Sequence, residues 1–197
     1  MAPSQTDLYK ESMIRRLDLR VKLVREKAER IKKNYIGGKK FCDAESEVNR
    51  IWLDQFTEGT GFDIACGDFL LGADTQAIGV DGTAKMLGTD FCSEGDNLSF
   101  QRDNTLDYVV TNYLDGMPSP LKALREWVRV LKPGGRIGVV CRDSDAYTDD
   151  LGVLSNARRQ SCYTEKILKN YLYRVGLRHV MVERHPKTLS IRGSGVK

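Results

Sequence analysis

Glycine and acidic residues follow two successive apolar segments of this 197-residue sequence, in positions that suit the binding of a polar ligand. Gly67 comes just after residues 62–65, and Asp81 comes directly after residues 77–80. A glycine lets the backbone approach a ligand closely because it has no side chain. A carboxylate offers two acceptor oxygens to ligand hydroxyl groups. If both segments are parallel strands, these residues lie in the crevice at the carboxyl ends of the strands.

Other kinds of site are disfavoured by what the sequence lacks. No Gly-x-Gly-x-x-Gly motif follows the first apolar segment, which argues against a dinucleotide cofactor such as NAD or FAD. The two histidines, His179 and His185, and the absence of a Cys-x-x-Cys motif argue against zinc, so we expect no metal site. The five cysteines are far apart and odd in number, which argues against a disulfide framework.

Apolar segments alternate with amphipathic helices over most of the chain, which predicts an open α/β sheet. Helices are expected at 120–131 and 164–175, where apolar residues recur at three- and four-residue steps. The expected strands are 62–65, 77–80, a short 85–87, 106–111, 136–141, 179–183 and 189–192. The turn Lys132-Pro133-Gly134-Gly135 is expected to lead into the fifth of these strands.

The first 40 residues carry twelve Lys or Arg against five Asp or Glu, so this end of the chain is basic. An apolar stripe runs along residues 7–35, which predicts a long amphipathic helix, and a second helix is expected at 43–56 with Asp43 as its cap. The basic faces suit a solvated helix that covers the sheet, a contact with RNA or DNA, or an anionic membrane surface. These alternatives stay open.

Connections early in the predicted sheet are short. Ten residues, 67–76, join the first two strands, and four residues, 81–84, precede the third. A crossover that contains a full helix needs about a dozen residues or more. We therefore expect reduced first crossover helices, with the N-terminal helices as the cover of the exposed sheet face. Residues 1–58 are expected to be a helical extension packed on a 59–197 domain, forming a single structural domain overall.

Five motifs of this sequence resemble, in their order and their spacing, those of class I S-adenosylmethionine-dependent methyltransferases with a type 11-like methyltransferase domain. The resemblance covers about residues 59–197. The motifs are residues 62–69 (Phe-Asp-Ile-Ala-Cys-Gly-Asp-Phe), 78–81 (Ile-Gly-Val-Asp), 88–91 (Gly-Thr-Asp-Phe), 98–110 and 130–136. The resemblance implies a Rossmann-like sheet, mostly parallel with an antiparallel terminal strand, and S-adenosylmethionine as cofactor. The chain departs from the pattern at Ala65 and Phe69, where the family usually has glycine.

The resemblance also implies roles for individual residues. Asp81 is expected to accept hydrogen bonds from the ribose hydroxyls, and Asp90, after the third strand, from the adenine amino group, with Phe91 beside the ring. Asp63 holds the turn after the first strand or reaches the ligand ammonium. The complete expected cofactor set is Asp63, Ala65, Cys66, Gly67, Asp81, Gly82, Asp90, Phe91, Asn112 and Tyr113.

The function implied is transfer of a methyl group from S-adenosylmethionine to an oxygen or nitrogen atom of an unidentified acceptor, a small molecule or RNA. The alternative is a non-catalytic binding or scaffolding protein with a degraded cofactor loop. A general base is optional for this reaction, because the sulfonium methyl group is already electrophilic. The candidates for acid, base or acceptor positioning are Tyr113, Asp115, Asp143, Asp145 and His185.

Nothing at the start of the sequence indicates export or membrane insertion. Residues 1–10 are polar, and no apolar run approaches the roughly 18 residues that span a bilayer. We therefore expect a cytoplasmic protein with reduced cysteines, of which Cys66 and Cys141 should be buried.

Overall fold

The computed structural model describes residues 44–67, 77–83, 89–146, 161–185 and 188–197. The chain separates into two compact units, Met1–Phe41 and Cys42–Lys197, and all described residues belong to the second. The expected helix at 7–35, the cap Asp43, the expected strand at 85–87 and most of the first two crossover connections lie outside the described residues. Within the described ranges, no helix is long and apolar enough to cross a membrane.

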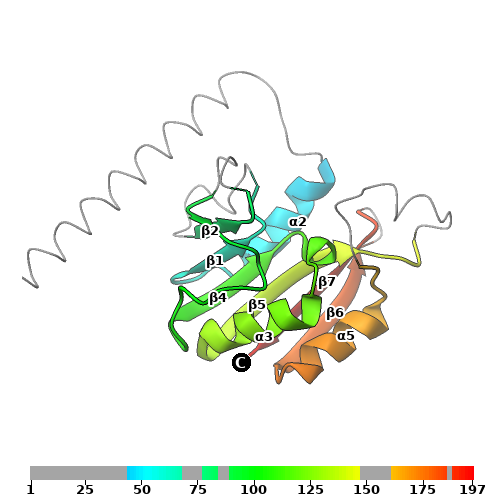
Figure 1. Cartoon of the computed structure of the whole chain (residues 1–197). Coiled ribbons are helices and arrows are strands. Elements are labelled where there is room, and N and C mark those ends of the chain that lie inside the picture. The colour runs from blue at the N-terminus through cyan, green and yellow to red at the C-terminus, as the bar shows by residue number, and fades with distance from the viewer. Residues whose placement is uncertain (1–43, 68–76, 84–88, 147–160, 186–187) are drawn as a thin grey trace, which may run out of the picture. The chain divides into compact units, whose positions relative to one another are not determined.

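Seven strands form one sheet in the order β3-β2-β1-β4-β5-β7-β6 (Figure 1). β1 to β5 pair in parallel, and β7 runs antiparallel to both β5 and β6. The strands are β1 (Gly61–Ile64), β2 (Ile78–Asp81), β3 (Phe91–Cys92), β4 (Leu106–Thr111), β5 (Leu131–Arg142), β6 (Arg178–His185) and β7 (Ser190–Val196). The mostly parallel sheet with an antiparallel terminal strand is confirmed.

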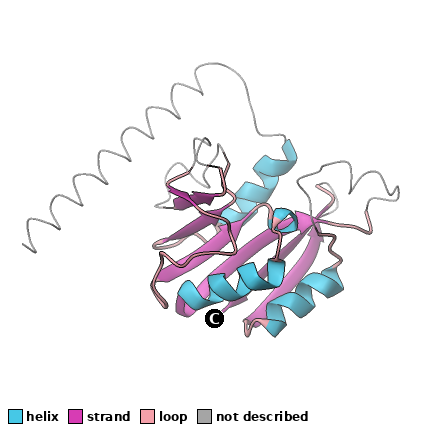
Figure 2. Cartoon of the chain, viewed as in Figure 1, coloured by secondary structure: helices cyan, strands magenta, loops and turns pink. Residues whose placement is uncertain are grey.

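Two helices and a short 3-10 helix cover one face of the sheet (Figure 2). They are α3 (Pro120–Val130), α5 (Glu165–Arg174) and η1 (Leu114–Gly116). Pro120 begins α3 with a backbone angle already suited to a helix, and the Thr164 hydroxyl caps α5 by accepting from the Ile167 N–H. Trp127 of α3 and Leu168 of α5 are fully buried against this face, so it holds the larger part of the core.

The other face is covered in part by α2 (Ala44–Asp54), the second helix predicted from the sequence. Leu53 of α2 is fully buried, and Phe56, just after the helix, packs in the same cluster against Val140. Gly138 of β5 permits this contact, because a Cβ atom there would lie 2.7 Å from the Phe56 ring. α2 therefore packs directly on the sheet, in the same compact unit as β1 to β7.

Two sequence expectations need correction. The described third strand is Phe91–Cys92, so Asp90 precedes this strand instead of following it. The turn at 132–135 does not separate α3 from β5, because it lies within β5 as an irregularity in the pairing with β4. Gly134 takes a left-handed conformation there, with φ of 83°, and its N–H donates to the Lys197 carbonyl oxygen at 3.0 Å.

α3 also anchors the connection that leads from β3 to β4. The indole N–H of Trp127 donates to the Gly95 carbonyl oxygen at 2.7 Å. Arg129 donates to the carbonyl oxygens of Leu98 and Gln101, and Glu126 accepts from Arg129 at 2.9 and 3.0 Å. This connection begins at the carboxyl ends of the strands, so α3 fixes residues next to the expected ligand crevice.

The Glu126–Arg129 pair predicts an acid-sensitive contribution to folding. Hydrogen bonding to Arg129 lowers the pKa of Glu126 from its ordinary value of 4.5, although burial opposes the shift. Because the folded-state pKa is the lower one, the contribution is present above about pH 4.5 and is lost as the pH falls through the folded-state value. In urea unfolding at pH 7 and at descending pH below 5, Glu126→Gln should lose less stability on acidification than the wild type.

Glu58→Gln is the matched control, because the Glu58 side chain is 87% exposed and lies 3.8 Å from Arg136. Its acid dependence should equal that of the wild type. If the free energy of unfolding of Glu126→Gln fell with pH as steeply as that of the wild type, the prediction would be contradicted.

Candidate functional site at the carboxyl edge of the sheet

The carboxylate of Asp81 joins the ends of β1 and β2 at the edge where the parallel strands terminate, here called the carboxyl edge. One oxygen, Oδ2, accepts from the Gly67 N–H at 3.1 Å, and the other, Oδ1, accepts from the Thr83 N–H at 2.8 Å. Each carboxylate oxygen has two lone pairs, so Asp81 keeps acceptor capacity for a ligand. Among the described residues, no heavy atom lies within 4 Å of where a Cβ atom on Gly67 would stand.

The loop after β1 keeps a glycine-like conformation at a residue that is not glycine. Ala65 has φ of 55° and Gly67 has φ of 58°, both in the left-handed region. The Ala65 N–H donates to the Val80 carbonyl oxygen at 2.7 Å, which holds the strained residue in place. Cys66 between them is buried, as is Asp63 within β1. The left-handed conformation of Ala65 therefore costs strain that a glycine would not pay.

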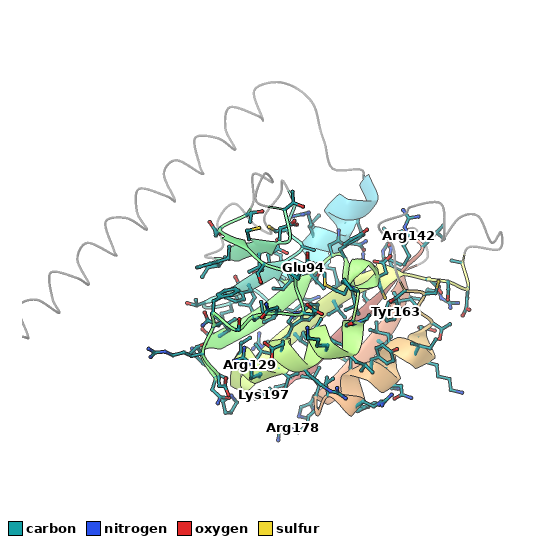
Figure 3. All side chains as sticks on the ribbon, in the orientation of Figure 1. Glu94, Arg129, Arg142, Tyr163, Arg178 and Lys197 are labelled. Atoms are coloured by element: carbon teal, nitrogen blue, oxygen red, sulfur yellow. The ribbon has the colours of Figure 1, made fainter. Side chains whose placement is uncertain are left out.

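The first acidic residue after β3 at the carboxyl edge is Glu94, which follows Ser93. Cys92 pairs with Asp81, so Glu94 lies beyond the level at which β2 ends, and its carboxylate would contact a Cβ atom on Gly82 at 2.9 Å. Asp90 lies nearer the middle of β2, where its Oδ2 accepts from the Gly79 N–H at 2.8 Å. Figure 3 shows Glu94 at the carboxyl edge, far from Arg129 and Lys197. The sequence analysis did not single out Glu94.

An aromatic pair flanks this part of the edge. Phe91 and Phe100 stack with ring centroids 4.9 Å apart and an interplanar angle of 15°, and both rings are partly exposed. Phe100 also contacts buried Phe62 of β1. An exposed aromatic stack beside the acids of β2 and β3 offers an apolar surface to a flat ligand.

β4 continues the site with Asn112 and Tyr113. The buried Thr111 hydroxyl donates to the Ile64 carbonyl oxygen at 2.8 Å and accepts from the Tyr113 N–H at 3.1 Å, so it connects the ends of β1 and β4. The Tyr113 ring packs over Gly116, where a Cβ atom would overlap it. Both Asn112 and Tyr113 are half-buried, which places polar groups at the centre of the carboxyl edge.

The candidate acids differ in their surroundings. Asp143, after β5, is fully buried and ion-paired with the Arg184 guanidinium, and exposed Asp145 accepts from the same guanidinium at 2.9 Å. Asp115 in η1 is buried, and its carbonyl oxygen accepts from the Ser161 N–H. The Asp143 carboxylate is therefore already engaged in an ion pair with Arg184.

Two further groups lie outside the centre of the site. His185 ends β6, three strands from β4 and thus about 14 Å away, and its Nδ1 is 2.9 Å from the Thr188 hydroxyl. Tyr163, which pairs with Asp143, is buried, and this burial raises the pKa of its hydroxyl well above the ordinary value. Tyr163 is therefore a hydrogen-bond donor at neutral pH. Among the described residues, no cluster of His, Cys, Asp or Glu could hold a metal ion.

Comparison with known proteins agrees with this geometry. Residues 58–139, from just before β1 into β5, match the family model described as a methyltransferase domain. Over these residues the chain is similar to a methyltransferase domain. A comparison with curated proteins gives no match.

Solved structures share the fold of the methyltransferase domain at low sequence identity. An S-adenosylmethionine-dependent methyltransferase from Archaeoglobus fulgidus aligns with a TM-score of 0.65 at 14% identity, over 83% of this chain and 99% of the other. The 1,6-didemethyltoxoflavin-N1-methyltransferase of Burkholderia thailandensis, with bound S-adenosylhomocysteine, aligns with a TM-score of 0.60 at 15% identity. This alignment covers 87% of this chain and 86% of the other. A methyltransferase from Mesorhizobium loti aligns with a TM-score of 0.59 at 18% identity, over 78% of this chain and 98% of the other.

The methyltransferase domain uses one residue from outside the matched region at its first loop. Arg50 of α2 donates from Nη2 to the Cys66 carbonyl oxygen at 3.4 Å. The sequence predicted a helix at 43–56 and its cap, but it predicted no partner for Arg50. The signal available was a single arginine on an amphipathic helix, and that is not specific enough to predict a partner.

The left-handed conformation of Ala65 predicts an unusual response to glycine. Ala65→Gly removes a strain of about 1–2 kcal/mol but gives the unfolded chain more freedom, worth about 0.5–1 kcal/mol. The free energy of unfolding should therefore rise by up to about 1 kcal/mol, measured by chemical denaturation. The same substitution at Ala123, in the middle of α3, should lower it by about 1 kcal/mol or more. Equal losses at both positions would show that Ala65 is not strained.

Proposed function

We propose that this chain transfers the methyl group of S-adenosylmethionine to an oxygen or nitrogen atom of an acceptor. The observation that carries the proposal is the arrangement at the carboxyl edge. There, the Asp81 carboxylate accepts from the Gly67 N–H, no other part of the described chain fills the position of a Gly67 Cβ atom, and Glu94 lies next to Gly82. This edge, at the end of the parallel strands, is where ligands bind in open α/β sheets. The methyltransferase domain supports the choice of cofactor.

The residues present fit the cofactor. Asp81 would accept from the two ribose hydroxyls with its remaining lone pairs, and Glu94 would accept from the adenine amino group. The partly exposed Phe91 offers an apolar surface to the adenine ring. The remaining proposed contacts of the methionine and ribose parts are Asp63, Ala65, Cys66, Gly67, Gly82, Asn112 and Tyr113.

When bound, the cofactor supplies an electrophilic methyl group on a positively charged sulfur. The chain then has to align the acceptor with that group and exclude water, and such alignment alone lowers the barrier substantially. Tyr113 and Asn112 are at the centre of the edge, where they would position the acceptor. Because Arg184 neutralises Asp143, we propose no dedicated base there.

A non-catalytic role is the second candidate, favoured by Ala65 in place of glycine. The loop nevertheless keeps the left-handed conformation at residue 65, and no other part of the described chain fills the position of a Gly67 Cβ atom. These two observations support an intact cofactor loop more than a degraded one. An acceptor that is RNA, contacted by the basic segment 7–35, and a cytoplasmic location remain proposals from the sequence.

Isothermal titration tests the cofactor directly. The wild type should bind S-adenosylmethionine and S-adenosylhomocysteine with dissociation constants below about 100 μM, and NAD should give no heat. Asp81→Ala should weaken the binding of S-adenosylmethionine and of S-adenosylhomocysteine about tenfold or more, because it removes an acceptor for the two ribose hydroxyl groups. Asp145→Ala is the control, since it removes an exposed carboxylate of the same edge, and its affinity should match the wild type. No binding by the wild type would end the proposal.

A second titration separates the two acids near β3. Glu94→Ala should weaken S-adenosylhomocysteine about three- to tenfold, because one hydrogen bond to the adenine amino group is lost. Glu94→Gln should lose less affinity than Glu94→Ala, because the glutamine amide oxygen can still accept from the adenine amino group. Asp90→Asn should leave the affinity unchanged, because Asp90 accepts from the Gly79 backbone. If Asp90→Asn weakened binding and the Glu94 variants did not, Asp90 would be the acceptor for the adenine amino group.

A further inference from the structure

A buried polar cluster fixes α2 on β7. The Asn49 side-chain oxygen accepts from Nε and Nη2 of Arg192 at 3.2 and 3.0 Å and from the Ser190 hydroxyl at 3.2 Å. The Thr188 hydroxyl joins the same cluster, 2.6 Å from that of Ser190. Asn49 and Arg192 are 3% and 5% exposed, and the guanidinium also donates to the Val48 carbonyl oxygen at 3.5 Å and lies 5.6 Å from the centroid of the Trp52 ring. Such a group needs its acceptor, because an uncompensated buried charge is strongly destabilising.

The next residue of α2 reaches the cofactor loop. Arg50 donates to the carbonyl oxygen of Cys66, which lies between the two left-handed residues Ala65 and Gly67. Asn49 and Arg50 are adjacent in the helix, so a shift or rotation of α2 at Asn49 moves Arg50 relative to the loop. α2 thus links the second-last strand of the sheet order to the end of β1.

The apolar contacts of α2 cannot set this link by themselves. Leu53 and Phe56 pack against Gly138 and the buried side chains of β4 and β5. Hydrophobic contacts are not directional, so they hold α2 on the sheet but tolerate small rotations. The hydrogen bonds at Asn49 have defined directions and therefore determine the rotation and axial position of the helix.

We propose that Asn49 and Arg192 are positioning residues for cofactor binding, which act through α2 and Arg50 on the carbonyl of Cys66. The proposal rests on the proposed function, because it takes the loop after β1 as the cofactor loop. Neither residue has to touch the ligand. In this proposal α2 connects the polar cluster on β7 to the loop after β1.

Titration of S-adenosylhomocysteine into five variants, one of them a double substitution, tests the chain of contacts. Asn49→Ala should weaken binding about three- to twentyfold, the range of such indirect couplings. Asn49→Asp should retain wild-type affinity, because a carboxylate still accepts from Arg192. Arg50→Met should weaken binding by a similar factor, and Asn49→Ala should add little in the Arg50→Met background. Val130→Ala, a core truncation in α3, should lower stability without changing affinity.

A sixth variant separates positioning of α2 from mere stabilisation of the fold. The double substitution Asn49→Leu with Arg192→Met replaces the buried polar pair by apolar side chains, which commonly preserves stability. If the hydrogen bonds only stabilise the fold, this variant should bind like the wild type, and the proposal is overturned. If they position α2, its affinity should fall although its melting temperature does not. This variant also decides the matter if Asn49→Ala fails to fold.

The remaining outcomes are equally distinct. Independent, additive effects of Asn49→Ala and Arg50→Met would overturn the proposal, because Asn49 would then not act through Arg50. Wild-type affinity in Asn49→Ala would do the same. If the wild type itself does not bind S-adenosylhomocysteine, the proposed function fails, and that result is separate from either of these.

Discussion

The hydrogen bond from the Gly67 N–H to the Asp81 carboxylate is the interaction on which the site depends. It connects the loop after β1 to the end of β2, and it requires the left-handed turn that Ala65 and Gly67 provide. The parallel pairing of β1 with β2 and β4 brings these residues to one edge. Loss of this bond would release the Gly67 backbone from the end of β2, next to the position proposed for the cofactor.

Much of this arrangement could be predicted from the sequence because parallel strands end at a common edge. Once residues 62–65 and 77–80 are strands, Gly67 and Asp81 must lie close together there. Glu94 could not be found in the same way. β3 has only two residues, Phe91 and Cys92, so it leaves no periodic pattern in the sequence, and Asp90 was an equally acidic neighbour. Only the pairing of Cys92 with Asp81 shows which acid lies beyond the strand.

The cover of the sheet shows a similar limit. The sequence predicted that helices before residue 59 pack on the sheet, and α2 does so through Leu53 and Phe56. What patterning could not reveal is the polar half of this contact. Asn49 and Arg192 are more than 140 residues apart, and a buried arginine is rare enough that a sequence reading assigns it to the surface. Their hydrogen bonds depend on the sheet order, which brings β7 under α2.

The part of the edge that we propose for the acceptor differs from the part proposed for the cofactor. Just after β5, Arg184 pairs with both Asp143 and Asp145, so these carboxylates are charge-compensated. Such a surface suits alignment of an acceptor more than proton abstraction. This agrees with the proposed chemistry, in which the reactivity comes from the cofactor.

Backbone amide chemical shifts on addition of S-adenosylhomocysteine test the central claim most directly, because they locate the ligand without any substitution. The account predicts that the largest shifts fall on Gly67, Gly82 and Gly95, which follow β1, β2 and β3. Gly135, at the amino end of the sheet beside Lys197, should not move. Saturating shifts confined to Gly135 and its neighbours, or binding with no shift at Gly67, would contradict the placement of the cofactor at the carboxyl edge.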